Sequence, residues 1–316
     1  MKYWTILLAT AALLFGFALA QKDTEEPATK KKKLVILTGD DLTHPSGTHE
    51  FKAGGALLKN AIAKSVLDSH IEVVHVHNWP EDTSVFEGAE MILHYYKGNR
   101  FHLLNRNAEF IDALAKQGVS QMFVHYACDP DTSVDNFIKS WTGGVYKDKY
   151  SSNPHWTLES QLEKHPINTG VENYTANDEW YMRIDFENDP VMGYDAPTVG
   201  SVHAVMAGEN VDGKNGDMTK VHPRFKKAVK DGKKSNTVVF WAKEAENGCR
   251  GITVTGAHYH TTWTIESFRK QVLNSIAWGL KLPIPETGVT SPDITEDQLN
   301  ENLDQSRKDF KRLKLN

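Results

Sequence analysis

Short apolar runs alternate with amphipathic segments in the first part of the chain. The first run is hydrophobic at every position, which is typical of a strand buried on both faces of a sheet. The runs lie at residues 34–37, 71–76, 91–95 and 119–124. Apolar positions at helical spacing occur over 51–67 and 107–117, and Gly118 is a typical helix stop. Strands alternating with helices predict an α/β fold, with a mostly parallel sheet and helices on both faces.

The alternation stops after Cys128 and resumes near residue 202. The intervening stretch is rich in Trp, Tyr, Asn, Asp and Pro, and we interpret it as a long loop-rich insertion with one strand near 180–186. The sheet then continues in three further apolar runs, followed by a closing helix. These elements are expected at 202–206, 237–242, 251–255 and 265–280.

The C-terminal residues carry a separate helix signal. Thr295 and Gln298 have the spacing of a capping box. Four apolar residues at helical spacing follow, which predicts a final helix docked on the domain. They are Leu299, Leu303, Phe310 and Leu313. We therefore expect one domain over 33–291 and a C-terminal helical extension over 292–316.

The N-terminus has the pattern of a secretory signal peptide at residues 1–20. Lys2 precedes an apolar run that ends in Ala18-Leu19-Ala20, a small-x-small cleavage pattern. The run is short for a membrane span, which needs about 20 residues, so no stable span is expected after cleavage. The mature chain would begin at Gln21, with a solvated linker over 21–32. This pattern predicts a periplasmic or secreted protein.

Composition limits the partners and the chemistry. The 316 residues are 40% hydrophobic and 24% charged, with a formal net charge of −5, and an acidic chain is a poor partner for nucleic acid. Cys128 follows one predicted strand, whereas Cys249 precedes another. In a parallel sheet these positions are at opposite ends, too far apart for a disulfide. Two free thiols are therefore expected.

Histidines collect where the predicted strands end. His44 and His49 follow the first strand, His125 follows the fourth, and His258 and His260 follow the last. The carboxyl ends of parallel strands meet at one edge of a sheet, where ligands bind. The sequence therefore predicts that these loops converge on one site.

Two kinds of chemistry fit such a cluster. Histidine exchanges protons near neutral pH, and neutral imidazole is also the commonest metal ligand. In the first interpretation His125 and His258 are acid–base catalysts, Glu179 is their carboxylate partner, and His44, His49 and His260 contact a ligand. In the second, a divalent metal is bound by a subset of the same five histidines. No spacing among them matches a known zinc motif, so both interpretations remain open.

Other catalytic classes have little support. The turn after the fourth strand reads His125-Tyr126-Ala127 and has no serine or cysteine at the position of a nucleophile. The sequence also lacks the glycine-rich motif of dinucleotide sites and the Walker A motif. No organic cofactor is predicted, and a divalent metal is the open alternative.

The insertion and the last loop combine directional polar groups with indoles. Amides and carboxylates beside aromatic faces suit a polyhydroxylated ligand. The candidate ligand contacts are His155, Trp156, Asp178, Trp180 and Trp263. The alternative is that the tryptophans form the core of the insertion.

Several short motifs together resemble the trehalose-utilisation (ThuA-like) family over residues 34 to about 291. They include Thr48-His49-Glu50-Phe51, Asn153-Pro154-His155-Trp156, Asp178-Glu179-Trp180-Tyr181 and Gly256-Ala257-His258-Tyr259-His260. The resemblance implies a flavodoxin-like, doubly wound fold similar to class I glutamine amidotransferases. It also implies a role in disaccharide breakdown through 3-keto-sugars. The amidotransferase relatives have a cysteine where this chain has His125-Tyr126-Ala127, so glutamine hydrolysis is not expected.

The leading hypothesis is an exported enzyme that acts on a keto-glycoside or disaccharide by histidine acid–base chemistry. A 3-keto group acidifies the neighbouring C–H, so proton abstraction followed by elimination or isomerisation requires no redox cofactor. The alternatives are a non-catalytic sugar-binding protein and a metal-dependent hydrolase that uses the same histidines. The sequence indicates neither the sugar nor the oligomeric state.

Overall fold

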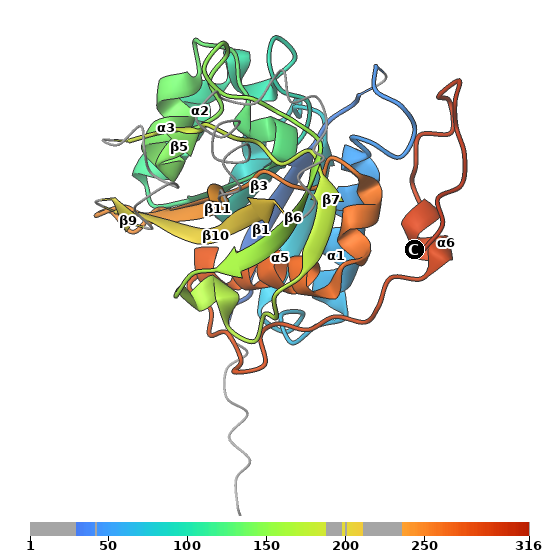
Figure 1. Cartoon of the computed structure of the whole chain (residues 1–316). Coiled ribbons are helices and arrows are strands. Elements are labelled where there is room, and N and C mark those ends of the chain that lie inside the picture. Colours follow the sequence, from blue (N-terminus) through green and yellow to red (C-terminus); the bar gives the residue numbers. More distant parts are fainter. Residues whose placement is uncertain (1–29, 42, 188–197, 200, 211–235, 316) are drawn as a thin grey trace, which may run out of the picture. The chain divides into compact units, whose positions relative to one another are not determined.

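The computed structural model describes residues 30–41, 43–187, 198–199, 201–210 and 236–315 (Figure 1). Within these residues the α-helices are α1 (Phe51–Ala63), α2 (Ala108–Lys116), α3 (Asp135–Thr142), α5 (Glu266–Gly279) and α6 (Glu296–Asn300). Short 3₁₀ turns cover Thr83–Phe86, Leu103–Arg106, His125–Cys128, Pro166–Asn168 and His260–Thr264. The predicted signal peptide and most of the linker lie outside the described residues.

The main sheet is parallel on one side and antiparallel on the other. Its order is β2-β1-β3-β4-β12-β11-β10-β6-β7, and β9 pairs with β10. The first five strands in this order are parallel, and the remaining pairs are antiparallel. The parallel strands are β1 (Lys32–Thr38), β2 (Ile71–His77), β3 (Ala89–Tyr95), β4 (Ser120–Val124) and β12 (Arg250–Val254). The antiparallel strands are β6 (Trp156–Leu162), β7 (Thr175–Asp178), β9 (Thr198–Val199), β10 (Val202–Asn210) and β11 (Asn236–Glu244).

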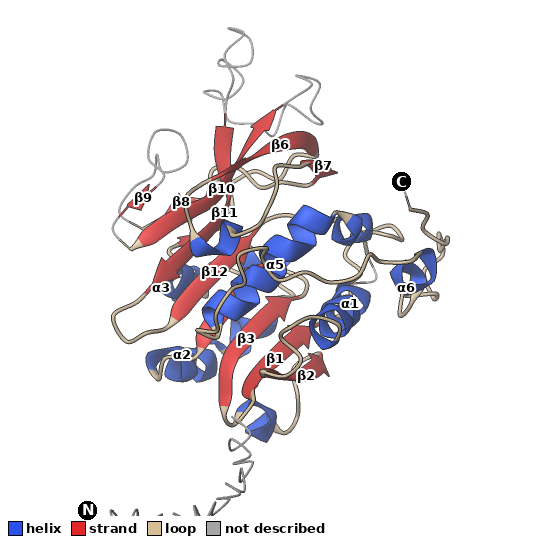
Figure 2. Ribbon diagram, turned by 90° about the horizontal axis from the view of Figure 1, so that it is seen from below, coloured by secondary structure: helices blue, strands red, loops and turns tan. Residues whose placement is uncertain are grey.

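Helices cover both faces of this sheet. Figure 2 shows α1 and α5 on one face and α2 and α3 on the other. Successive residues of β1 point to opposite faces, so Leu34 and Ile36 belong to the core beneath α1 and α5, and Val35 and Leu37 to the core beneath α2 and α3. All four side chains are fully buried. This confirms the α/β fold and explains why the four successive residues 34–37 are all hydrophobic.

The structure corrects the prediction for the insertion. Only Asp185–Phe186 (β8) is a strand within the predicted 180–186 segment, and it pairs with β5 (Gly144–Val145). The sheet is extended instead by β6 and β7, which the sequence did not reveal. Their apolar residues are few because burial alternates along both strands and only one face is covered.

The C-terminal helix is much shorter than predicted. The capping box of Thr295 and Gln298 is present, but α6 ends at Asn300, and Asn302 has a positive φ of 60°. Leu299 and Leu303 are buried as expected. Turns and irregular backbone follow, and Arg307 and Asp309 bond to the distant loop at Thr48 and Ser46. None of the described helices is long and apolar enough to span a bilayer.

The two cysteines remain reduced thiols, as expected. Cys128 follows β4 and Cys249 precedes β12, which pairs with β4 in parallel. Both thiols are buried and free. Titration of denatured, unreduced protein should therefore find two thiols per chain, because the strands hold the cysteines at opposite ends. A result of no thiols in a monomer would contradict this arrangement.

Candidate metal centre

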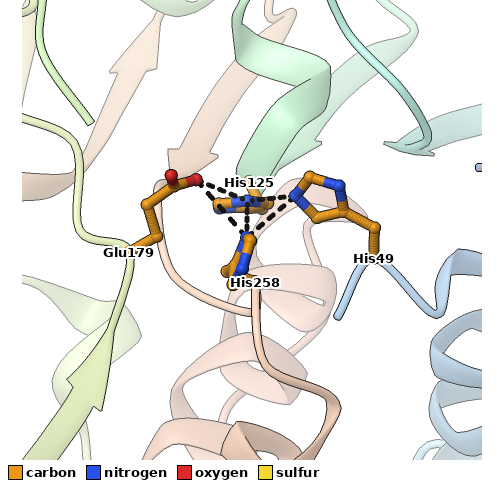
Figure 3. Close-up of side chains that lie close together, drawn as sticks. All are labelled: His49, His125, Glu179 and His258. Carbon is orange, nitrogen blue, oxygen red and sulfur yellow. Dashed lines mark hydrogen bonds and ion pairs between the residues drawn. The ribbon is translucent and has the colours of Figure 1, made fainter. Parts of the chain in front are cut away.

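Three histidines converge at the carboxyl edge of the parallel strands (Figure 3). His49 lies beyond β1, His125 directly follows β4, and His258 lies beyond β12. Glu179, directly after β7, approaches them from the antiparallel side of the sheet. All four side chains are buried. The predicted convergence of the strand-end loops therefore holds for these three histidines, and Glu179 is within reach of them.

The backbone that presents two of these histidines is strained. His49 has a φ of 52° and His125 a φ of 51°, and residues other than glycine rarely adopt such values. Strain of this kind persists where surrounding contacts impose it, and it clusters at functional sites. One such contact is the hydrogen bond from the amide N of His49 to the carbonyl of His258, 2.9 Å long. The loops that carry two members of the cluster are therefore bonded directly to each other.

The converging atoms are close enough to share one ion. Nε2 of His49 lies 3.0 Å from Nε2 of His125 and 2.9 Å from Nδ1 of His258, and the latter two atoms are 3.3 Å apart. Oε2 of Glu179 is 3.4 Å from both His125 Nε2 and His258 Nδ1. Ligand atoms around a first-row divalent ion are about 2.8–3.6 Å apart, given bonds of about 2.0–2.2 Å. These five distances therefore match a coordination shell, and all four atoms lie within 4.8 Å of one another.

Hydrogen bonding on the far side of two rings fixes which nitrogen carries the proton. Nδ1 of His125 lies 2.7 Å from the carbonyl oxygen of Thr255, which can only accept. Nδ1 of His49 lies 2.8 Å from a carboxylate oxygen of Asp41. Each Nδ1 therefore donates, and in the neutral rings each Nε2 presents a lone pair to the cluster.

The cluster consequently has more acceptors than donors. Two imidazole lone pairs and a carboxylate oxygen face one another, and neutral His258 has at most one N–H to offer them. Burial, followed by repulsion from the neighbouring histidines, lowers the pKa of His49 to about 2 despite its bond to Asp41. A neutral His49 cannot supply the missing proton. Buried acceptors without donors are costly, and a cation bound between them removes that cost.

Glu179 is held as a carboxylate with one oxygen directed at the cluster. Its Oε1 accepts a hydrogen bond of 2.9 Å from Asn153 and lies 3.5 Å from Nε2 of His155. Burial would raise the pKa of Glu179, but its interactions with the neighbouring His125 and His258 rings outweigh burial and hold the pKa well below its ordinary value. Oε2 is thus free to bind a cation together with the imidazoles.

Asp41 supports the cluster without being part of it. Its buried carboxylate lies 2.6 Å from Nδ1 of His44 and 3.0 Å from the ammonium of Lys97, besides its bond to His49. Burial would raise the pKa of Asp41, but the hydrogen bonds from these three side chains and from Thr43 hold it well below the usual range. Because Lys97 already neutralises this carboxylate, a second metal ion at Asp41 and His44 would meet an adjacent positive charge.

Two partly exposed histidines border the cluster. The side chain of His155 is 43% exposed, and its Nδ1 lies 2.9 Å from the hydroxyl of Tyr259. The side chain of His44 is 34% exposed, and its ring centroid is 4.0 Å from that of His49. Solvent therefore reaches the edge of the cluster at these two rings.

The remaining predicted contact residues are buried away from solvent. Trp156, Trp180 and Trp263 are at most 1% exposed and belong to the hydrophobic core beneath α1 and α5. This corrects the expectation that their rings stack on a ligand, because no face is accessible. His260 is fully buried and is not among the converging residues, and burial lowers its pKa to about 4.

Asp178 is a structural anchor of the site. Its two carboxylate oxygens accept hydrogen bonds from the backbone amides of Ala257, His258 and Glu179 and from the hydroxyl of Thr262. It is fully buried, so it has no surface for a ligand, in contrast to the sequence-based expectation. The residue instead fixes the backbone that carries two members of the cluster.

Asp129, near the site, provides a pH-dependent test of the electrostatics. Burial, then repulsion from Asp148, Asp135 and Glu179, raises its pKa to about 8. The pKa of an aspartate in the unfolded chain is near 4. The contribution of Asp129 to the free energy of unfolding is therefore fully present below that pH and is lost as the pH rises through about 8. Asp129→Asn should remove this loss, since asparagine stays neutral.

We expect wild type to lose more unfolding free energy than Asp129→Asn between pH 5 and pH 8.5. Urea unfolding of both proteins after chelator treatment measures the difference. Asp68→Asn, at an exposed position, is the control and should follow wild type. Equal losses in wild type and Asp129→Asn would contradict the raised pKa.

Comparison with known proteins supports the fold. No protein-family model matches the chain, and a search of curated proteins finds no significant sequence relative. A solved structure described as ThuA-like, from Bacteroides uniformis, has a TM-score of 0.52 and 13% identity, covering 81% of this chain and 94% of its own. A second, from Parabacteroides merdae, has a TM-score of 0.50 and 14% identity, covering 83% and 98%. At these identities the likeness establishes a ThuA-like fold.

Proposed function

We propose that this protein is a metal-dependent enzyme whose single divalent ion is bound by His49, His125, His258 and Glu179. The observation that carries the proposal is the surplus of buried acceptors, above all the two Nε2 lone pairs 3.0 Å apart. Neutral imidazoles with one carboxylate suit zinc, iron and similar first-row ions. The donors behind them, such as the Asp41 carboxylate on His49, are the outer partners that metal-binding histidines usually have.

The substrate class we propose is a polyhydroxylated compound with a carbonyl group, such as a keto-glycoside. A divalent ion held by the three histidines and Glu179 would supply Lewis-acid chemistry, polarising a carbonyl and stabilising negative charge on its oxygen. His155, which is half exposed and whose ring is oriented by Tyr259 and Glu179, would take the proton from the carbon beside the carbonyl. It would return this proton to the neighbouring carbon of the enolate in an isomerisation, or to the departing glycosidic oxygen in an elimination. The ThuA-like fold, and the resemblance of the sequence motifs to that family, support a sugar as the substrate.

This assignment changes the roles of two histidines. His125 and His258 were expected to be acid–base catalysts, but their converging nitrogens are buried and directed at each other. We therefore assign them to metal binding and give proton transfer to His155. The alternative without a metal is that a proton shared among the same nitrogens compensates the acceptors, and His125 and His258 then act in acid–base catalysis.

Metal removal and reconstitution distinguish the metal-dependent enzyme from the metal-free alternative. Purified protein is treated with a chelator, reloaded with Zn²⁺, Mn²⁺, Fe²⁺ or Co²⁺, and tested on a panel of keto-glycosides and their parent disaccharides. The proposal expects activity that disappears with the metal and returns with one of the ions. Activity that survives complete metal removal would favour the acid–base alternative, and sugar binding without any turnover would favour a binding protein.

We further propose that the chain is exported, because residues 1–20 have the pattern of a signal peptide. N-terminal sequencing of the protein from its native source should return Gln21 as the first residue. Recovery of Met1 would rule out cleavage.

A further inference from the structure

We propose that Arg307 and the segment around it, residues 302–313, form a clasp that positions His49 for metal binding. The inference rests on the metal centre proposed above and adds a part of the chain that is distant from it in sequence. Arg307 does not contact the imidazole of His49. It acts through the backbone of the loop that carries this ring, residues 44–49, and is therefore a positioning residue.

One guanidinium group binds both ends of this loop. Nη1 of Arg307 donates to the carbonyl oxygens of His44, Pro45 and Thr48, at 3.1, 2.8 and 2.9 Å. Nη2 donates to the carbonyl of His49 itself at 3.4 Å. The Arg307 side chain is only 4% exposed. Because these bonds are shielded from water, they fix the loop more firmly than the same bonds at a surface.

The loop needs such a contact because its backbone conformation is unfavourable. His49 has a φ of 52°, and left-handed residues other than glycine persist only where the surroundings impose them. Glu50 connects the loop to the clasp, since its carboxylate accepts from the amides of Gly47 and Asp304 and lies 3.6 Å from Arg307. A buried charge pair and four carbonyl bonds therefore hold the turn that leads into His49.

Other residues of the clasp contact the same loop. The carboxylate of Asp309 accepts from the amide of Ser46 at 2.9 Å. The Leu313 side chain lies over Gly47, so closely that a Cβ atom at Gly47 would be 2.8 Å from it. The clasp and the loop also share the lining of a cavity of about 400 Å³, to which Asp41 and His49 contribute. The segment therefore lines a cavity beside His49 and also holds the loop that carries this residue.

Loss of the Arg307 side chain should weaken metal binding while the chain remains folded. Partners that orient a metal ligand typically contribute about 10–100-fold to metal affinity. We expect Arg307→Ala to lower the affinity for Zn²⁺ and Co²⁺ by about this factor and to alter the visible spectrum of bound Co²⁺. Arg307→Lys retains the charge without the fork of donors and should be intermediate.

Two controls separate positioning from general destabilisation. Arg312→Ala removes an exposed arginine of the same segment, whose ion pair is with Asp297. Ile111→Ala opens a cavity in the core on the other face of the sheet. Both should retain wild-type metal affinity and the wild-type Co²⁺ spectrum. Affinities are measured by competition with a chromophoric chelator, and each variant is first tested for folding by circular dichroism.

The outcomes distinguish the clasp from the metal centre itself. Wild-type affinity and spectrum in Arg307→Ala would overturn the clasp and leave the proposed function intact. Wild-type protein that binds no metal would overturn both. If neither Arg307 variant folds, Asp309→Ala, which alters an exposed side chain, decides the question. Reduced affinity in it supports the clasp, and unchanged affinity overturns it.

Discussion

His258→Ala should lose its bound metal ion and lower turnover by at least about 100-fold, while the chain remains folded. His258 Nδ1 lies within 3.4 Å of the three other converging atoms, so its removal leaves an incomplete coordination shell. The ring is at the end of a strand and not within an apolar core, so truncation opens no large apolar cavity. Metal content and turnover of wild type and variant, measured on the same preparations, test this expectation.

Two other histidine variants make the result specific. His155→Ala should retain the metal and lose turnover, because the polar contacts of His155 are with the Tyr259 hydroxyl and the outer oxygen of Glu179, and not with the converging atoms. His70→Ala, at an exposed position away from the site, should keep both properties. Full activity in His258→Ala would mean that the histidine cluster is structural. Retention of the metal together with loss of turnover in that variant would instead assign His258 to proton transfer.

Asp178→Ala should lower the free energy of unfolding by about 3 kcal/mol or more. The buried carboxylate of Asp178 accepts four hydrogen bonds, from three backbone amides and the hydroxyl of Thr262. Alanine leaves these donors without partners in a site closed to water, and each such group is costly. One of the amides belongs to Ala257, which has a φ of 78° and depends on this bond to hold a strained backbone.

Urea unfolding of metal-free wild type and variant measures this loss. Asp68→Ala, at an exposed position, should change the unfolding free energy by less than about 0.5 kcal/mol. A loss below about 1 kcal/mol in Asp178→Ala would show that the loop is held mainly by its other contacts. The Asp178 carboxylate would then be dispensable for stability, contrary to our assignment.

The clearest strand signal in the sequence belongs to a segment whose burial is complete. Strand β1 is apolar at four successive positions because both faces are covered, and its loop could be placed at the carboxyl edge of the sheet. The same reasoning predicted that His49, His125 and His258 lie close together. By contrast, β6 and β7 have only one covered face and carry many polar residues. No apolar run in the sequence therefore predicts them.

The parts of the site that escaped prediction depend on contacts between distant residues. The burial of Trp156 and Trp180 could not be distinguished from ligand stacking, because an indole suits both environments. The position of Asp41 shortly after the first strand indicates a possible site residue. Its hydrogen bond to His49, however, depends on how the loop folds and could not be predicted. Arg307 binds a loop more than 250 residues earlier in the chain, and no local pattern indicates such a contact.

Sequence also could not decide between proton transfer and metal binding. The decision depends on which nitrogen of each ring carries hydrogen, and this is determined by the Thr255 carbonyl and the Asp41 carboxylate. Thr255 lies 130 residues from His125 in the sequence. Asp41 lies eight residues before His49, in the segment between β1 and α1. Only the folded arrangement reveals that the lone pairs face each other.

The metal content of the purified, full-length protein tests the central claim most directly. Inductively coupled plasma mass spectrometry is performed on protein as isolated and after reconstitution with Zn²⁺, Mn²⁺, Fe²⁺ or Co²⁺ followed by removal of free ions. We predict one tightly bound divalent ion per chain in at least one of these preparations, and none in His258→Ala. Less than a tenth of an ion per chain in every preparation of folded wild-type protein would contradict the account.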